Sequence, residues 1–261
     1  MMKQVSLLLL FFVGSAFAED RLPRLELGAA LFGLHAPDYR GAKSDDSYLF
    51  PIPYIKYRGD RVKVDDGAKG LLFDSPDLEI SISGNVTLPV DNDSKAREGM
   101  DELDPLFELG PSINYRFRQL DQSAWWLSLP LRFAYTLDTE LEHVGYVIQP
   151  RISWRKPARR LGDWQLNFNT GPLYISEDYH DYYYSVDPED ATPTRPAYTA
   201  EAGFSGWRSD FSYSKRFQKY WLGGFVRYNS LQGAEIEDSP LVFEKDSLIV
   251  GLALGYVFFE K

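Results

Sequence analysis

One short stretch of the chain, residues 124–137, alternates between two kinds of side chain without a break. Every second position is apolar or aromatic, and these positions are Trp125, Leu127, Leu129, Leu131, Phe133, Tyr135 and Leu137. Because successive side chains of a strand point to opposite faces, a strand here has one wholly apolar face and one mixed face. Such a face, with Trp at one end and Tyr near the other, is typical of a strand that crosses a bilayer. A strand of a soluble β-sandwich is the alternative.

The first eighteen residues have the pattern of a secretory signal peptide. Lys3 is followed by an apolar run from Leu7 to Val13 and by Ala16-Phe17-Ala18, a small-x-small cleavage site. We therefore expect residues 1–18 to be removed and residues 19–261 to form the mature protein, with an uncleaved anchor as the alternative. No later stretch reaches the roughly 18 apolar residues that a spanning helix needs. A closed barrel is the other fold that satisfies every backbone group in lipid.

Composition excludes several classes of function. Aromatic residues make up 15% of the chain, which suits two aromatic girdles at the membrane boundaries. Because the formal net charge is −10, binding to nucleic acid is not expected. The chain has no Cys, so it offers no thiol nucleophile, no Cys-type metal site and no lipoprotein anchor.

Eleven further stretches have strand character, and with residues 124–137 they predict twelve strands. Two short ones, Arg61–Asp65 and Gly70–Phe73, leave ten strands as the alternative. We expect a bent or weakly paired strand at Pro51 and Pro53, since proline donates no ladder bond. The eleven stretches are Arg24–Leu34, Tyr48–Arg58, Arg61–Asp65, Gly70–Phe73, Leu78–Val90, Pro105–Phe117, His143–Arg155, Trp164–Ile175, Tyr198–Phe217, Tyr220–Leu231 and Asp246–Phe259.

Within Tyr198–Phe217 the apolar phase slips by one residue, from Ala202 and Phe204 to Phe211 and Tyr213. This slip predicts a β-bulge near Gly206–Asp210.

The connections alternate between short and long, which is typical of outer-membrane barrels with short periplasmic turns and long outer loops. Gln218-Lys219 is one of the short links, and Ser176–Pro196 is the longest of the long ones. The predicted fold is therefore all-β: a single domain forming a closed antiparallel transmembrane β-barrel of about twelve strands with long acidic outer loops. Both chain ends should lie on the periplasmic side, which requires an even number of strands.

Several segments resemble the MipA/OmpV family of Gram-negative outer-membrane proteins, and their order and spacing together carry the resemblance. The segments are Ala36-Pro37-Asp38-Tyr39-Arg40-Gly41, Leu49-Phe50-Pro51-Ile52-Pro53-Tyr54, Leu109-Gly110-Pro111-Ser112-Ile113-Asn114-Tyr115, Tyr183-Tyr184-Ser185-Val186, Ala197-Tyr198, Tyr220-Trp221, Leu231-Gln232-Gly233-Ala234, Asp238-Ser239-Pro240 and Gly255-Tyr256.

The resemblance implies a non-enzymatic protein of the cell outer membrane, in contact with membrane lipid and lipopolysaccharide. It also implies a scaffold that brings a lytic murein transglycosylase together with a penicillin-binding protein that polymerises murein (peptidoglycan). No catalytic residues follow from the family. The alternative is a small-solute channel or receptor, which acidic loops above a polar lumen favour.

The residues themselves suggest little chemistry. His180 and Ser185 share one loop with Asp178 and Asp181, which raises the possibility of a catalytic pair. An ordinary polar outer loop is the favoured interpretation, because the spacing matches no hydrolase signature. We expect no catalytic residue, no metal ligand and no cofactor. In the same loop we expect Tyr179, Tyr182, Tyr183 and Tyr184 to form the top of an aromatic girdle, with a ligand platform as the alternative.

Carboxylates are dense in three of the long connections. We favour solvated loops, although such groups can also hold divalent cations or attract cationic solutes. These carboxylates are Asp91, Asp93, Glu98, Asp101, Glu102, Asp104, Glu177, Asp178, Asp181, Asp187, Glu189, Asp190, Glu235, Glu237, Asp238, Glu244 and Asp246.

Polar residues of both signs fall on the faces expected to line the lumen. Pairs between them would plug a narrow barrel, whereas a twelve-stranded barrel can also pass small solutes. The expected lumen residues are Glu79, Asn85, Glu108, Asn114, Arg116, Arg132, Gln149, Arg151, Arg155, Gln165, Asn167, Asn169, Glu201 and Arg227.

Overall fold

The structure, a computed structural model, describes residues 22–60, 62–64, 68–91 and 96–261. The expected signal peptide, residues 1–18, lies outside the described residues. The described chain contains thirteen β-strands and one α-helix, α1 (Glu177–Tyr184). The strands are β1 (Leu25–Pro37), β2 (Asp45–Arg58), β3 (Val62–Val64), β4 (Ala68–Asp74), β5 (Leu78–Val86), β6 (Leu106–Gln119), β7 (Ala124–Thr136), β8 (His143–Ile148), β9 (Arg151–Lys156), β10 (Trp164–Ile175), β11 (Gly203–Phe217), β12 (Tyr220–Ser230) and β13 (Asp246–Glu260).

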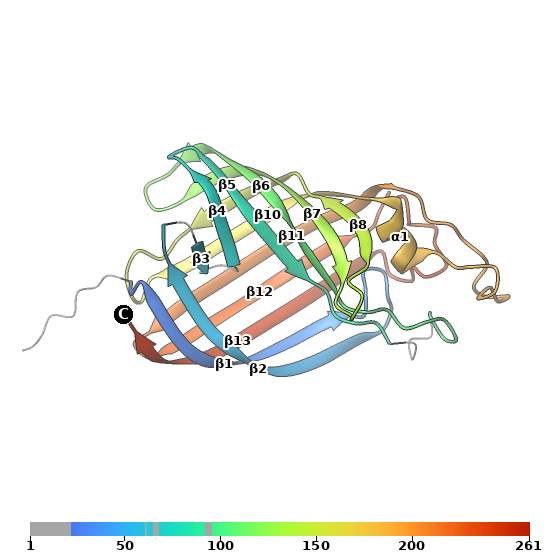
Figure 1. Cartoon of the computed structure of the whole chain (residues 1–261), viewed down its shortest axis with the longest axis horizontal. Helices are drawn as coiled ribbons and strands as arrows, with labels where there is room; N and C mark the ends of the chain where they lie inside the picture. Colours follow the sequence, from blue (N-terminus) through green and yellow to red (C-terminus); the bar gives the residue numbers. More distant parts are fainter. Residues whose placement is uncertain (1–21, 61, 65–67, 92–95) are drawn as a thin grey trace, which may run out of the picture.

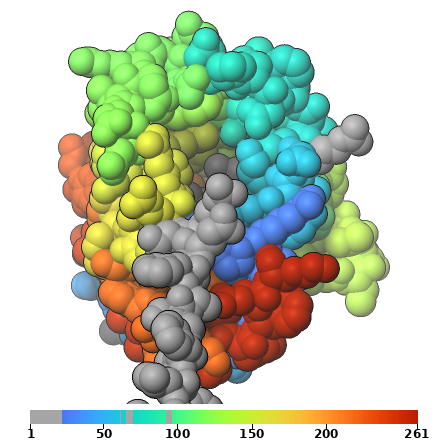
Figure 2. All heavy atoms as spheres, turned by 90° about the vertical axis from the view of Figure 1, so that its left-hand side faces the viewer, coloured from blue at the N-terminus to red at the C-terminus, as the bar shows by residue number. Residues whose placement is uncertain are grey.

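The strands form one antiparallel sheet that closes on itself. Strands that follow one another in the wall pair in order, and β13 pairs with β1 from Glu26↔Glu260 to His35↔Val250. Strands β8 and β9 both lie between β7 and β10, so they are two halves of one wall strand interrupted at residues 149–150. The barrel therefore has twelve strands, as predicted, and not ten. Figure 1 shows it from the side, and Figure 2 shows the red C-terminal strand beside the blue first strand.

The alternation in β7 matches the two sides of the barrel wall. Leu127 and Leu129 point outward and are 48% and 46% exposed, whereas Ser128, Arg132 and Ala134 point inward and are buried. The other strands also present exposed Leu, Ile, Val and aromatic side chains to the outside. An apolar outer surface of this kind suits contact with hydrocarbon.

The two ends of the barrel differ in their connections. At the end where β1 begins and β13 finishes, named the terminal end, the connections are short: residues 59–61, 75–77, 120–123, 157–163 and 218–219. At the opposite end, named the loop end, the described residues of the connections include 38–44, 87–91, 96–105, 137–142, 176–202 and 231–245. The predicted alternation is confirmed, and residues 65–67 between β3 and β4 lie outside the described residues. No helix in the described parts of the chain is long and apolar enough to cross a membrane.

The bulge predicted from the phase slip is confirmed at its edge. Along β10, Pro172 and Tyr174 are two residues apart, whereas their partners on β11, Trp207 and Phe204, are three apart. The extra residue falls at Gly206, where φ is +90° and a Cβ would lie 2.0 Å from a backbone oxygen of β12. Glycine is therefore required there.

Of two expectations about single strands, one is wrong. Strand β11 begins at Gly203 and not at Tyr198, because Tyr198 pairs with Val186 in the loop end instead of continuing the wall. The weak pairing expected at Pro51 and Pro53 is found on one edge of β2: the ladder to β1 runs without a register shift, whereas the other edge pairs with β3 only at Tyr57 and Arg58. We infer that the missing proline donors face the other edge of β2, where a sheet tolerates proline.

Candidate functional site

The lumen is filled at the terminal end by a network around Glu26. The Glu26 carboxylate is fully buried and lies 2.6 Å from Arg58 Nη1 and 2.7 Å from Arg216 Nη1. The Tyr54 hydroxyl donates to Glu26 Oε2 at 2.9 Å, and the Tyr54 ring lies 5.1 Å from that of Trp221. Because β1, β2, β11 and β12 supply these side chains, the network ties several strands together across the lumen.

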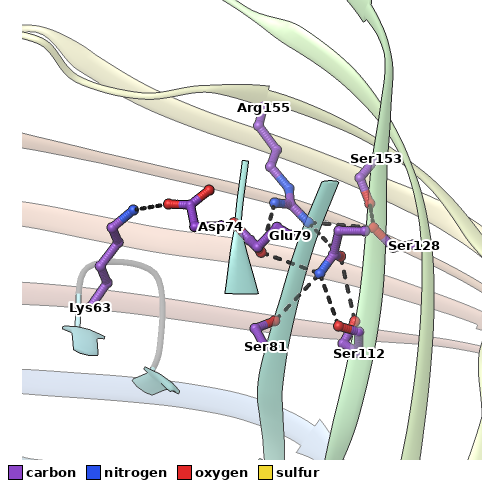
Figure 3. Close-up of polar contacts among 9 residues, drawn as sticks. Lys63, Asp74, Glu79, Ser81, Ser112, Ser128, Ser153 and Arg155 are labelled. Carbon is purple, nitrogen blue, oxygen red and sulfur yellow. Dashed lines mark hydrogen bonds and ion pairs between the residues drawn. The ribbon is translucent and has the colours of Figure 1, made fainter. Parts of the chain in front are cut away.

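A second polar network runs along the lumen face of the wall from β5 through β6 and β7 to β9 (Figure 3). The Arg155 guanidinium lies 3.6 Å from Glu79 and donates to Asn114 Oδ1 at 3.0 Å and to the Ser128 hydroxyl at 3.4 Å. Asn114 in turn donates to Glu79 Oε1 at 3.2 Å. Lumen residues of opposite sign therefore pair across neighbouring strands, and the sequence had left open whether such pairs plug the barrel or leave room for small solutes.

The lumen wall nearer the loop end carries more cations than carboxylates. Arg132 Nε donates to Glu108 Oε2 at 2.7 Å, and Arg227 Nε donates to Asp210 Oδ1 at 2.5 Å. Arg208 donates to an amide oxygen, Asn229 Oδ1, at 3.0 Å. Among the described residues, no carboxylate lies within 4.0 Å of the Arg208 guanidinium, so its charge is not matched by an ion pair.

Helix α1 roofs the lumen at the loop end with three buried tyrosines. The hydroxyls of Tyr179, Tyr183 and Tyr184 donate to Glu108 Oε1 at 3.0 Å, Thr87 Oγ1 at 3.2 Å and Arg40 O at 2.8 Å. Burial raises the pKa of all three hydroxyls, so they remain neutral donors. The expectation that they top an aromatic girdle is wrong, because they face inward from a helix within the predicted loop.

A glycine in the wall permits the close approach of α1. Gly145 in β8 has φ +125°, and a Cβ on it would lie 2.2 Å from Ser176 Oγ and 3.0 Å from the Tyr179 backbone nitrogen. The same Ser176 hydroxyl accepts a hydrogen bond from the Tyr146 N–H at 2.9 Å. A larger side chain at position 145 would therefore push the start of α1 off the wall.

The structure does not bring His180 and Ser185 together. Ser185 Oγ accepts a hydrogen bond from the Ala200 N–H at 2.9 Å. His180 is fully buried and instead contacts the Glu201 carbonyl oxygen through Nδ1 at 2.6 Å and Ser205 Oγ through Nε2 at 2.8 Å. Since neither His180 nor Ser205 lines the cavity described below, this pair anchors α1 to the bulge of β11 rather than meeting a solute.

The partners of His180 also fix its protonation. A carbonyl can only accept, so Nδ1 carries the proton and the Ser205 hydroxyl donates to Nε2. Arg40 donates to both the hydroxyl and the carbonyl oxygen of Ser205 at 2.7 Å. Burial, together with the nearby Arg40 charge, lowers the pKa of His180 to about 4. His180 is therefore a neutral anchor at pH 7.

Beneath α1 lies a cavity of about 470 Å³, named the lumen cavity. Its lining has an apolar side and a polar side, and the polar side includes the unmatched charge of Arg208. A cavity of this size, with a largely apolar wall and a few convergent polar groups, has the character of a small-molecule site. The apolar side includes Phe32, Leu34, Phe50, Phe225 and Ile249, and the polar side includes Arg40, Glu108, Tyr179, Arg208 and Arg227.

The acidic residues of the long connections lie at the loop end, apart from Asp93, which lies outside the described residues. The connections also have a core of their own, since Ile236 and Leu241 are fully buried and Val90 is 1% exposed. Within residues 22–60, 62–64, 68–91 and 96–261, no group of three or more His, Cys, Asp or Glu side chains is placed to hold a metal ion.

The apolar side of the lumen cavity was not predicted. One signal for it was present in β1. Leu31 lies on one face of this strand and Phe32 and Leu34 lie on the other, so that both faces, including the one towards the lumen, carry apolar side chains. Arg208 was missed because the bulge in β11 made it impossible to tell from the sequence which residues near the bulge point into the lumen. Glu201 was expected in the lumen, but it is exposed and precedes β11.

Three comparisons relate the chain to known proteins. The profile of the family described as "MltA-interacting protein MipA" matches residues 27–258. The chain is 30% identical over 91 residues to outer membrane protein Omp26La of Vibrio anguillarum and 31% identical over 91 residues to outer membrane protein OmpV of Vibrio cholerae. These alignments span 34% of this chain and 34% of the length of each Vibrio protein.

The Escherichia coli protein YiaT, whose name describes an outer membrane protein, is 26% identical over 264 residues, covering 97% of both chains. Among solved structures, the CymD monoaromatic hydrocarbon channel aligns at a TM-score of 0.36 with 8% identity, covering 91% of this chain and 89% of that one.

Proposed function

The chain belongs to the MipA family, and from this premise we propose that it is an outer-membrane barrel that binds a small solute in its lumen cavity, as a receptor or an uptake protein. Export would use residues 1–18 as a cleaved signal peptide, and residues 19–261 would form the single barrel domain. The terminal end would face the periplasm and the loop end the outside of the cell.

One observation carries this proposal: the lumen cavity pairs an apolar wall with an arginine, Arg208, that donates to an amide and forms no ion pair within 4.0 Å with a described carboxylate. An apolar body would lie against Phe32, Phe50 and Phe225, while an acidic group would reach the Arg208 guanidinium. These features match a small amphipathic anion. The conduction route of an open pore has less support, because the buried network around Glu26 joins β1, β2 and β11 inside the lumen at the terminal end.

Calorimetric titration of the detergent-solubilised protein tests the proposal. The probe is 4-phenylbutyrate, a phenyl ring on a short chain with a carboxylate, and its heat of mixing with empty micelles is subtracted. We expect saturable binding of one equivalent. A hydrogen bond to a charged group contributes about 1.5–3 kcal/mol, so Arg208→Gln should weaken binding by roughly ten- to a hundredfold.

Arg116→Gln is the matched control, because Arg116 pairs with Asp77 at the exposed rim of the terminal end and does not line the lumen cavity. Its affinity should equal that of the wild-type protein. Absence of saturable heat, or an equal loss in both variants, would contradict a binding site at Arg208.

The description of the family favours a second function, a scaffold for murein-remodelling enzymes. In this role the terminal end would contact a lytic murein transglycosylase and a penicillin-binding protein in the periplasm. Cross-linking in intact cells, followed by identification of the partners by mass spectrometry, tests it. Recovery of neither type of enzyme, from cells that contain both, would contradict the scaffold.

A further inference from the structure

The barrel wall is incomplete between β2 and β5, because the two strands that lie between them, β3 and β4, are short. Strand β3 has three residues and pairs with β2 only at Tyr57 and Arg58. Strand β4 pairs with β5 only from Gly70↔Ile82 to Asp74↔Glu79. The β3–β4 hairpin therefore closes the wall near the terminal end and stops well short of the loop end.

Beyond the hairpin, two strand edges face each other without pairing. In the described chain, residues 45–56 of β2 pair with β1 alone, and residues 83–86 of β5 pair with β6 alone. Figure 1 looks onto this part of the wall, and strand β12 is seen behind it, between β2 and β5. We name this region the β2–β5 gap.

The lumen cavity extends into the β2–β5 gap. Phe50 shares its face of β2 with the buried Tyr54, so it points inward, yet 37% of it is exposed. Val86 shares its face of β5 with the exposed Ile82, so it points outward and is 66% exposed. Both line the same cavity. Because Phe50 and Val86 both border it, the cavity reaches the unpaired part of the wall.

The rim of the gap is apolar. Leu49 and Val86, its outward residues, are each 66% exposed. Val86 pairs with Phe107, whose ring stacks on Tyr135 at 5.4 Å between centroids, and such outward aromatic pairs are typical of the membrane boundary. The gap therefore opens towards lipid at the boundary nearer the loop end.

An added β-strand is a poorer occupant of the gap than a small molecule. Pro51 and Pro53 withhold backbone donors from β2, and prolines at a sheet edge protect it from pairing with another strand. The unpaired stretch of β5 is also only four residues long, from Ser83 to Val86. Neither edge offers a template for strand addition.

We propose that the β2–β5 gap is a lateral portal through which a small amphipathic anion passes between the outer leaflet and the lumen cavity. This inference rests on the proposed function and adds the route to it. The apolar part of the solute moves from acyl chains past Leu49 and Val86 onto Phe50, while its acidic group leaves the lipid boundary for Arg208. The solute then avoids both the α1 roof and the Glu26 network.

Single-cysteine labelling tests the portal directly, because the natural chain has no Cys. The variants Phe50→Cys at the portal, Ser112→Cys inside a fully paired wall and Val86→Cys on the outer surface are reconstituted separately into lipid vesicles. Each is labelled with N-(1-pyrenyl)maleimide, which partitions into the bilayer. Ser112 is the matched inward-facing control, since it is buried between β5 and β7.

We expect Cys at positions 50 and 86 to be labelled roughly tenfold faster or more than Cys at position 112, because a fully paired wall leaves no path from lipid to lumen. In the Phe50→Cys background, Val86→Trp should slow labelling by filling the gap. Ile152→Trp, an equally apolar outward change on β9, which is paired on both edges, should leave the rate unchanged. Heat-modifiable migration confirms that each variant is folded.

Labelling at position 50 no faster than at position 112, or equal effects of the two Trp substitutions, would overturn the portal. This outcome is distinct from failure of the proposed function. If 4-phenylbutyrate binds but position 50 is protected, the solute site stands without a lateral route. If position 50 is labelled but nothing binds, the solute function falls.

Discussion

Protonation of His180 should loosen the attachment of α1 to the barrel. The side chain is fully buried, and its two ring nitrogens are committed to the Glu201 carbonyl and the Ser205 hydroxyl. A protonated ring must donate from both nitrogens, so the Ser205 hydroxyl would lose its acceptor. The imidazolium would also lie close to the charge of Arg40, which already donates to Ser205.

The magnitude follows from the pKa of about 4 for His180 in the folded protein, against an ordinary value of 6.5. One pKa unit corresponds to about 1.4 kcal/mol, so the difference is worth about 3 kcal/mol. As the pH falls below 6.5, unfolded His180 binds a proton that the folded protein does not. The free energy of unfolding therefore decreases from about pH 6.5 and stops decreasing at about pH 4.

Urea unfolding in detergent, followed by tryptophan fluorescence at pH 7 and pH 4, measures this effect. His180→Gln keeps an acceptor near Ser205 but does not titrate, so its disadvantage relative to wild type should shrink by about 3 kcal/mol at pH 4. His143→Gln, at an exposed histidine of the loop end, is the control and should show a much smaller change. A wild-type advantage over His180→Gln that is the same at both pH values would refute the reasoning.

Three further predictions concern the wall, the roof and the location of the protein. Leu129→Arg should lower the yield of folded protein far more than Leu137→Arg, because Arg on the lipid face costs about 2–4 kcal/mol at mid-membrane but about 0–1 near the boundary; heat-modifiable migration in detergent gels measures the folded fraction. Gly145→Ala should lower the thermal midpoint more than Gly162→Ala, since both have positive φ but only a Cβ at position 145 meets Ser176 Oγ. The mature protein should fractionate with outer membranes, and recovery in the soluble periplasm would contradict this.

The barrel could be predicted from sequence because its determinants are local. In β7, seven alternating apolar positions are enough to define the outward face, and each neighbour, such as Ser128 or Arg132, then points inward. The bulge in β11 was equally local, since a single phase slip marks it. Strand pairing followed from the order of short turns, as hairpins join neighbours in sequence.

The roof could not be predicted, because α1 owes its stability to contacts distant in sequence. Its segment carries Glu177, Asp178 and Asp181 among tyrosines, and it has no apolar stripe of helical spacing that would have marked it. The helix is held by Thr87 and Arg40, which lie 96 and 144 residues away from their tyrosine partners. Tyrosine is equally suited to a girdle and to a buried polar cap, so residue type could not decide between them.

The lumen cavity escaped prediction for a related reason. A rule that places polar side chains inside and apolar side chains outside assigns Phe50 to the lipid face or leaves the direction of its side chain undecided. Its inward direction follows from the register of β2 against β1, where Phe50 pairs with Phe32. The portal depends on an absence of pairing partners, which only the complete order of strands reveals.

The two closures of the lumen differ in what it costs to open them, and this bears on where a solute can enter. At the terminal end, Glu26 is buried between Arg58 and Arg216, and breaking a buried ion pair costs about 3–5 kcal/mol. At the loop end, the hydroxyls of Tyr183 and Tyr184 donate to neutral acceptors in bonds with a net worth of about 1 kcal/mol each. Helix α1 is held in addition by the bond of Tyr179 to the Glu108 carboxylate and by the buried His180 contacts. The β2–β5 gap requires no bond to break. With the proposed portal, exchange of a solute should therefore be faster through the wall than past the α1 roof or the Glu26 network, so that a solute entering the lumen cavity from the outer leaflet returns by the same route.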